Sequence, residues 1–175
     1  MSVKQLITVR GEVLLSRTLR YFPGAMVVIS DNEHKDKFIR LAKNTMILES
    51  TGSLIESLIN TYKHWSDWNV ILLGDVYYSI HTIKQIMDCQ DELMFFGNSK
   101  EIYALVFRDK EKMLQACRET LAKGGKKLWH LYRLIQGIDI LEHRICENFT
   151  KTQDTIDFDC YLQYEEYLRC HRRNR

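Results

Sequence analysis

Apolar residues are distributed along the chain in two alternating patterns. The first pattern is a short, continuous apolar run rich in β-branched and aromatic residues, which is typical of a buried strand. Pro23-Gly24 precedes the first of these runs and Gly74 follows the second, as expected where a strand begins or ends at a turn. The sequence therefore predicts four strands, over 25–30, 69–73, 92–96 and 102–107.

The second pattern consists of apolar positions that recur every three or four residues, which indicates amphipathic helices. Ser53 and Glu56 match a capping box, so a helix is expected to begin directly after Ser53. Ser79 is expected to cap another helix, and Gly124-Gly125 and Gly137 are expected to end two more. The spacing predicts helices over 13–21, 54–62, 80–87, 113–121, 128–135 and 162–173.

Strands that alternate with helices favour an α/β fold. We expect a three-layer α/β/α arrangement around a mostly parallel central sheet, formed by residues 1–175 as a single domain. The chain has 175 residues, 45% of them apolar, and one proline, which excludes collagen-like and low-complexity chains. Ligands of such sheets bind beyond the carboxyl ends of the strands. The segments Ser30-Asp31-Asn32 and Gly74-Asp75-Val76 are therefore the first places to look for a site.

The net charge and the cysteine content limit which binding partners and which cellular compartment are expected for the protein. A net charge of +2 is too small to indicate a nucleic-acid partner, and no apolar run approaches the ~20 residues that cross a membrane. The five cysteines are odd in number and form no Cys-x-x-Cys pair, which argues against a disulfide framework or a zinc site. The six histidines lack metalloprotease spacing, which favours surface or helix-capping roles. We expect a cytoplasmic protein without a nucleic-acid or membrane partner, and homo-oligomerisation stays open.

Two groups of carboxylates are candidate metal ligands. Gly74 and Asp75 follow an apolar strand, and an aspartate there can bind Mg²⁺ or can simply bond to nearby amides of the turn. Asp157 and Asp159 are two residues apart, so on a strand they lie on one side, where they either share a cation or face solvent. If Asp75 and Asp159 meet in the fold, they form a metal pair, which the sequence leaves open.

Four segments carry a family resemblance, in the same order along the chain as in the family. They are residues 4–19, Thr51-Gly-Ser-Leu-Ile-Glu-Ser-Leu58, Leu72-Leu-Gly-Asp-Val76 and Asp157-Phe-Asp-Cys-Tyr-Leu-Gln-Tyr-Glu165. The family that they resemble is that of the nucleotidyltransferases that make activated sugars and alcohols, with the nucleotide-diphospho-sugar transferase fold. In this family the four segments resemble, in turn, the stretch after the signature loop, the lining of the nucleotide pocket, the metal-binding Gly-Asp and a degraded form of the closing motif.

The resemblance implies a magnesium-dependent enzyme. It would transfer a nucleotidyl group from a nucleoside triphosphate to a phosphorylated sugar or alcohol, with release of pyrophosphate. The implied catalytic residues are Lys4, Asp75 and Asp159, the implied magnesium ligands are Asp75, Asp157 and Asp159, and the implied nucleotide-binding residues are Gly52, Ser53 and Gly74.

The family opens with a strand and a Gly-rich loop that have no counterpart before Lys4. We therefore expect an N-terminally shortened fold, in which the first strand is lost, replaced by residues 4–9, or supplied by another subunit. Two other function classes stay open. The absent loop favours a catalytically inactive binding or assembly module on the same fold, and Asp157-Phe-Asp159 favours a glycosyltransferase that uses a nucleotide sugar.

Overall fold

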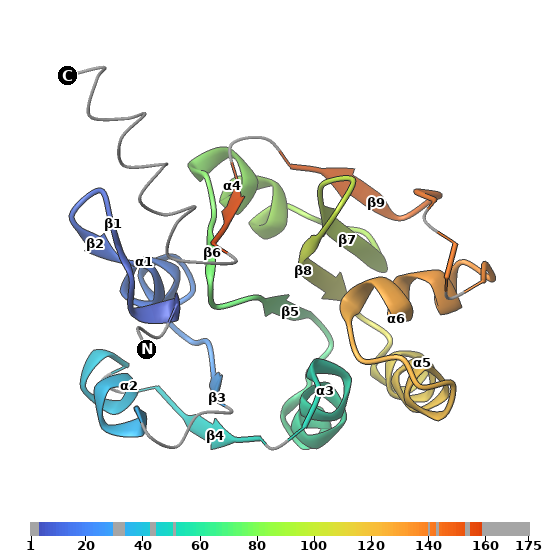
Figure 1. The fold of residues 1–175 in the computed structure, drawn as a ribbon, viewed down its shortest axis with the longest axis horizontal. Coiled ribbons are helices and arrows are strands. Elements are labelled where there is room, and N and C mark those ends of the chain that lie inside the picture. Colours follow the sequence, from blue (N-terminus) through green and yellow to red (C-terminus); the bar gives the residue numbers. More distant parts are fainter. Residues whose placement is uncertain are drawn as a thin grey trace.

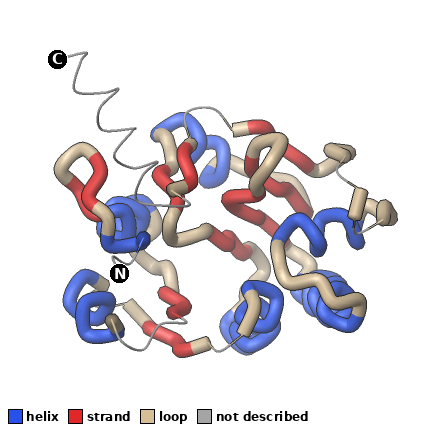
Figure 2. Tube along the Cα trace, viewed as in Figure 1, coloured by secondary structure: helices blue, strands red, loops and turns tan. Residues whose placement is uncertain are grey.

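The computed structural model describes residues 4–29, 34–42, 45–50, 52–139, 141–142, 144–152 and 155–158, and Figures 1 and 2 show how they are arranged. The helices are η1 (Lys4–Leu6), α1 (Leu14–Tyr21), α2 (Lys35–Leu41), α3 (Leu54–Thr61), η2 (Tyr62–His64), α4 (Ile80–Met87), α5 (Lys110–Ala122) and α6 (Leu128–Ile135). The strands are β1 (Thr8–Val9), β2 (Glu12–Val13), β3 (Val27–Ile29), β4 (Ile47–Glu49), β5 (Asn69–Leu72), β6 (Val76–Tyr77), β7 (Leu93–Gly97), β8 (Ile102–Phe107), β9 (Phe149–Lys151) and β10 (Ile156–Asp157).

The fold is α/β, and its largest sheet has four strands in the order β5-β8-β7-β9. The β5–β8 and β7–β8 pairs are antiparallel, and the β7–β9 pair is parallel. A mostly parallel central sheet is therefore not confirmed. The physical reason lies in the connection between β7 and β8, which is too short to be a crossover and turns the chain back on itself as a hairpin.

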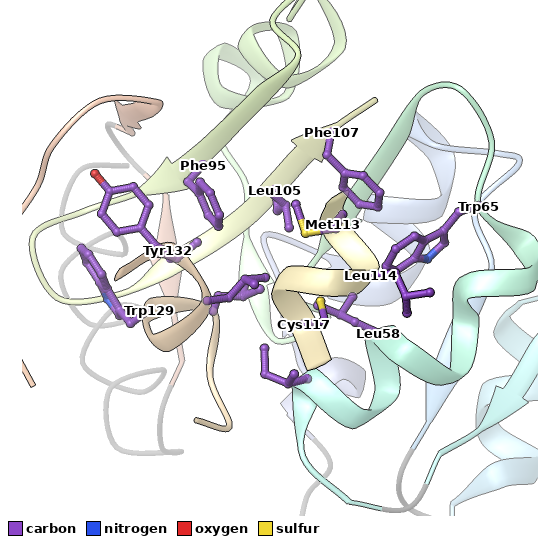
Figure 3. Close-up of a cluster of buried hydrophobic side chains, with 14 residues drawn as sticks. Leu58, Trp65, Phe95, Leu105, Phe107, Met113, Leu114, Cys117, Trp129 and Tyr132 are labelled. Atoms are coloured by element: carbon purple, nitrogen blue, oxygen red, sulfur yellow. The ribbon is translucent and has the colours of Figure 1, made fainter. Parts of the chain in front are cut away.

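One face of this sheet is covered by α3, α5 and α6 (Figure 3). Phe95, Leu105 and Phe107 point from β7 and β8 into this layer, and each is at most 1% exposed. Tyr132 of α6 packs edge-on against Phe95, with ring centroids 5.0 Å apart. Burying each such side chain contributes about 1.5–3 kcal/mol relative to leaving it in water, so this cluster is the main core of the molecule.

The other face of the sheet is covered by α4. Ala104 and Val106 of β8 alternate with the residues of the first face and pack with Ile83 and Ile86 of α4. All six residues of β8 are buried, as expected for a central strand with helices on both faces.

The helix ends follow the local signals in the sequence. The capping box of α3 is present, since Ser53 Oγ accepts from the Glu56 amide at 3.3 Å and the Ser53 amide donates to the Glu56 carboxylate at 2.5 Å. Ser79 caps α4 by accepting from the Thr82 amide at 3.1 Å. Gly124 and Gly137 have φ of +79° and +65° after α5 and α6, the conformation in which glycine ends a helix.

The four predicted strands are confirmed as β3, β5, β7 and β8, and the helices predicted over 13–21, 54–62, 80–87, 113–121 and 128–135 as α1, α3, α4, α5 and α6. The predicted helix over 162–173 lies outside the described residues.

The N-terminal third of the molecule contains two further small sheets. Strands β3 and β4 make a two-stranded parallel sheet, and β1 and β2 make a short antiparallel hairpin. Leu15, Ile29 and Phe38 form its small core. A cleft of about 980 Å³ lies between this part and β5, and it is bordered by β3 on one side and β5 on the other. Residues 4–9 form η1 and β1, so they do not replace a strand beside β5.

Candidate functional site

The site begins where β5 ends. The apolar strand β5 runs to Leu72, Gly74 and Asp75 make a turn, and β6 begins at Val76. A Cβ on Gly74 would lie 3.0 Å from Cγ of Gln5, so glycine allows the N-terminal segment to approach this turn closely. The Asp75 side chain is 24% exposed, so it is partly accessible to solvent.

Lys4 lies at this turn. Its Nζ is 3.8 Å from Oδ2 of Asp75, and both side chains are partly exposed. The 3₁₀ helix η1 holds Lys4 there because the residues that follow it are anchored. Ile7 and Val9 are buried in a cluster with Leu14 and Tyr77, which ties the N-terminal segment to α1 and β6.

Asp157 reaches the same region from the other end of the chain. Strand β10 pairs antiparallel with β6, and Asp157 lies opposite Val76, the residue after Asp75. Phe158 is fully buried in the cluster that holds the N-terminal segment, and Oγ1 of Thr155 is 2.8 Å from Oγ1 of Thr82 in α4. Oδ1 of Asp157 is shielded from solvent, which argues against a fully solvated edge strand here. Asp159 lies outside the described residues.

The pKa of the buried Tyr78 hydroxyl is affected by the carboxylates of this region. Its hydroxyl lies 2.6 Å from the carbonyl oxygen of Tyr103 and 3.1 Å from that of Leu73. Burial is the main reason that the pKa of Tyr78 lies well above its usual value, and the carboxylates of Asp75 and Asp157 raise it further. Both carboxylates therefore act on the same buried hydroxyl.

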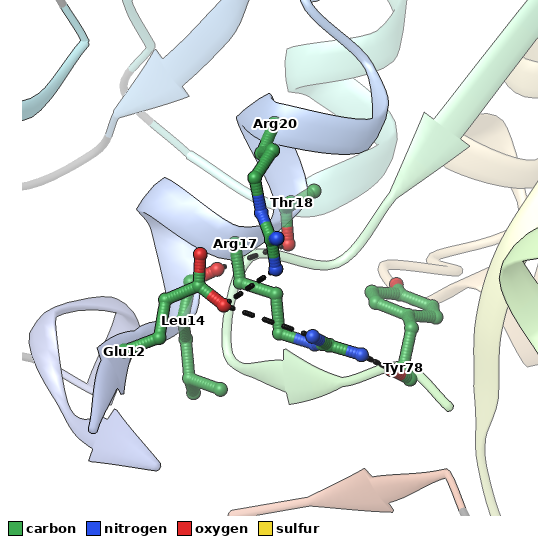
Figure 4. A network of polar contacts seen from close by, with 6 residues as sticks. All are labelled: Glu12, Leu14, Arg17, Thr18, Arg20 and Tyr78. Atoms are coloured by element: carbon green, nitrogen blue, oxygen red, sulfur yellow. Dashed lines mark hydrogen bonds and ion pairs between the residues drawn. The ribbon is translucent and has the colours of Figure 1, made fainter. Parts of the chain in front are cut away.

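Arg17 is a residue of this region that the sequence reasoning missed (Figure 4). It lies on α1, is 9% exposed, and donates from Nη2 to the carbonyl oxygen of Tyr78 at 3.2 Å. Its guanidinium also lies over the ring of Tyr77, 4.7 Å from the centroid, and 3.7 Å from the carboxylate of Glu12. The available signal was its position three residues after Leu14 on the apolar face of a helix, where an arginine needs a partner.

Gly52 and Ser53, two of the residues implied to bind the nucleotide, have different surroundings. Gly52 borders the cleft together with Gly74, Asp75 and Gln5. Its φ is +114°, and a Cβ there would lie 2.4 Å from a carboxylate oxygen of Glu56, so the capping box already requires a glycine. Ser53 uses its hydroxyl and its amide in that box and does not border the cleft.

The chemistry of the donors fits a hard divalent cation. Asp75 lies in the turn before β6 and Asp157 lies on β10, which pairs with β6, and Mg²⁺ is commonly bound by one or two carboxylates together with substrate phosphates and water. No group of three or more His, Cys, Asp or Glu side chains suited to a metal occurs within the part of the chain that the structure describes. An ion at Asp75 would complete its coordination with water or with the phosphates of a ligand.

No protein-family model matches the chain, and no curated protein matches its sequence. Among the helices formed by the described residues, none is long and apolar enough to cross a membrane.

Proposed function

We propose that the protein is a magnesium-dependent nucleotidyltransferase that transfers a nucleotidyl group from a nucleoside triphosphate to a phosphorylated sugar or alcohol. The observation that carries the proposal is the 3.8 Å approach of Lys4 to Asp75, together with the pairing of Asp157 opposite Val76, the residue after Asp75. These residues come from distant parts of the chain. A turn aspartate with a purely local role needs neither a lysine nor a second carboxylate from distant segments.

Each residue has a role that its position supports. Asp75 and Asp157, with Asp159 as the third acidic residue of the resemblance, would hold Mg²⁺. When bound, the ion would neutralise phosphate charge and align the phosphates. Lys4 would place its ammonium beside the same phosphates and stabilise the charge that develops on their oxygens. Gly52 and Gly74 border the cleft and would lie beside the nucleotide there.

The reaction follows from these positions. A phosphate oxygen of the acceptor would attack the α-phosphorus of the triphosphate, a new phosphorus–oxygen bond would form, and the bond to the leaving pyrophosphate would break in line with it. Positioning and neutralisation of charge account for most catalysis of this kind. The proposal includes a three-layer architecture of the nucleotide-diphospho-sugar transferase type. In this architecture the two-stranded β3-β4 sheet and the four-stranded β5-β8-β7-β9 sheet are parts of one larger sheet.

The direct test is pyrophosphate release. The protein is incubated with Mg²⁺, each of the common nucleoside triphosphates in turn, and a panel of phosphorylated sugars and alcohols. We expect release that requires both Mg²⁺ and one class of acceptor. Asp75→Asn keeps the size of the side chain and removes its charge, and it should lower the rate roughly 100-fold. Asp67→Asn is the matched control, since Asp67 is exposed and does not border the cleft.

The same samples separate the other function classes. A bound nucleotide must raise the melting temperature, so a rise without pyrophosphate release favours a binding module. Release of a nucleoside diphosphate from a nucleotide sugar favours a glycosyltransferase. If there is no pyrophosphate release and no nucleotide-dependent rise in melting temperature, the proposal is contradicted.

A further inference from the structure

The cleft between β3 and β5 lies between two strand edges. Among the described residues, β3 pairs only with β4, and β5 pairs only with β8. Each strand therefore has a second edge along which no strand of the described chain lies. Side chains of both strands, including Val28 and Ile71, border the same cleft of about 980 Å³.

Both strands have the composition of interior strands. The residues Val27–Ile29 and Val70, Ile71 and Leu72 are all apolar, which is typical of parallel strands that are covered on both faces. Natural edge strands are protected by charged residues, proline or bulges, and none of these occurs in Val27–Ile29 or Asn69–Leu72. The side chains from Val70 to Leu72 remain partly exposed, whereas every residue of the adjacent β8 is buried.

Apolar exposure is concentrated at the cleft. Eight large apolar residues of the described chain are exposed, and four of them border the cleft. The four are Val28, Met46, Trp68 and Met87, with exposures from 38% to 54%. A concentration of this kind marks a surface that is covered in the working molecule.

The N-terminal segment 4–6 packs near the carboxyl ends of both β3 and β5. Leu6 packs against the cluster that contains Ile29, the last residue of β3. Gln5 lies beside Gly74, just beyond the end of β5. The carboxyl ends of β3 and β5 therefore both lie near the N-terminal segment 4–6.

We propose that the cleft is the seat of a β-strand that lies on the N-terminal side of Lys4 in the complete polypeptide. This strand runs parallel to β3 and β5, pairs with both, and unites the two sheets into one. A strand of about five apolar residues spans the length of its neighbours. Its carboxyl end lies at the Gln5 side of the cleft.

The two exposed edges favour a strand over other occupants. A small apolar molecule would cover the side chains but would leave two rows of backbone amides and carbonyls without partners, which is costly in a dry space. A second copy would have to donate an apolar strand, and the long apolar strands of the described chain are already paired. The inference does not depend on the proposed activity, because a protein that binds no nucleotide could still contain this strand.

The test compares the natural protein with the 175-residue chain. The natural form is purified from its source cells through an affinity tag at the C-terminus, and its intact mass is measured. We expect a mass above the 20.8 kDa of the present chain plus the tag. A natural mass equal to that sum would overturn the proposal.

A cysteine probe tests where the added residues lie. Val28→Cys is a near-isosteric change in the wall of the cleft, and Ile39→Cys is the control, since Ile39 is 47% exposed on α2 and does not border the cleft. In the natural form, a maleimide should modify Cys at position 28 on the order of tenfold more slowly than in the 175-residue chain, with equal rates at position 39. Equal rates at position 28 would contradict the proposal. Slow modification of the 175-residue chain together with a dimeric mass by light scattering would assign the cleft to a second copy instead.

Discussion

Nη2 of Arg17 lies 3.2 Å from the backbone carbonyl oxygen of Tyr78 and donates a hydrogen bond to it. This bond joins α1 to the segment that directly follows β6 (Figure 4). Arg17 therefore helps to hold the turn that carries Asp75 against the N-terminal segment that carries Lys4.

Arg17→Met should destabilise the protein by about 1–3 kcal/mol, because the change leaves a buried carbonyl without its donor. Arg20→Met on the same helix is the control. Arg20 is 57% exposed, and its contact with Glu12 is a surface ion pair, so its loss should cost about 0–1 kcal/mol. Urea unfolding followed by circular dichroism measures both values. Equal losses would show that the bond to Tyr78 has no special weight.

Lys4→Met should lower pyrophosphate release roughly 100-fold with little change in the melting temperature. The ammonium would be lost at the phosphates, whereas its 3.8 Å contact with Asp75 is partly exposed and adds little stability. Lys37→Met, an exposed change on α2, is the comparison. If both variants retained the full rate, Lys4 would have no catalytic role.

Ser53→Ala should lower the free energy of unfolding by about 1 kcal/mol, since the N-cap of α3 is lost. Ser99→Ala, an exposed change outside the helices, should cost less. Because the Ser53 hydroxyl is occupied by the cap, nucleotide affinity should change little in the folded variant. A large loss of affinity at unchanged stability would instead support the predicted contact of Ser53 with the nucleotide.

His130 should make stability depend on pH. Its Nδ1 accepts from the amides of Lys126 and Lys127, and burial, followed by the charges of Arg133 and Lys127, lowers its pKa below 6.5. The unfolded chain then takes up the proton first, so stability is fully present above pH 6.5 and falls as the pH drops from there through the folded pKa. His130→Ala should reduce this dependence, and His81→Ala, an exposed control, should preserve it. Melting temperatures between pH 5 and 8 give the comparison.

Cys117 should be inert to thiol reagents in the folded protein. Burial raises its pKa to about 12, so almost no thiolate forms at neutral pH. Cys146 is only partly buried and should be modified before Cys117. Peptide mapping by mass spectrometry after brief treatment with a maleimide distinguishes the two. Modification of Cys117 as fast as that of Cys146 would indicate that the helical layer over the sheet opens readily.

Four strands and five helices were predictable from the sequence because local chemistry decides them, whereas α2 and several of the shorter strands were not predicted. The apolar runs gave the positions of β3, β5, β7 and β8, and the Ser53 cap and the glycine after α5 marked helix ends. These features depend on residues a few positions apart, whose side chains bond to nearby backbone groups or share one face.

The pairing of the strands was not predictable in the same way. Alternating strands and helices favoured a mostly parallel sheet, yet β8 pairs antiparallel with both β5 and β7. Apolar runs look alike whether their neighbours run parallel or antiparallel, so the pattern does not encode direction. The short turn from β7 to β8 decides it.

The candidate site likewise contains features that a local sequence pattern predicts and features that only the tertiary structure decides. Gly74 and Asp75 could be singled out in the sequence, because a glycine and a carboxylate after a buried strand have a recognisable local pattern. The 3.8 Å approach of Lys4, the pairing of Asp157 beside Asp75, and the inward position of Arg17 are decided only in the tertiary structure. They depend on how the buried cluster of Ile7, Tyr77 and Phe158 draws both ends of the chain onto β6, and no local pattern fixes such long-range packing.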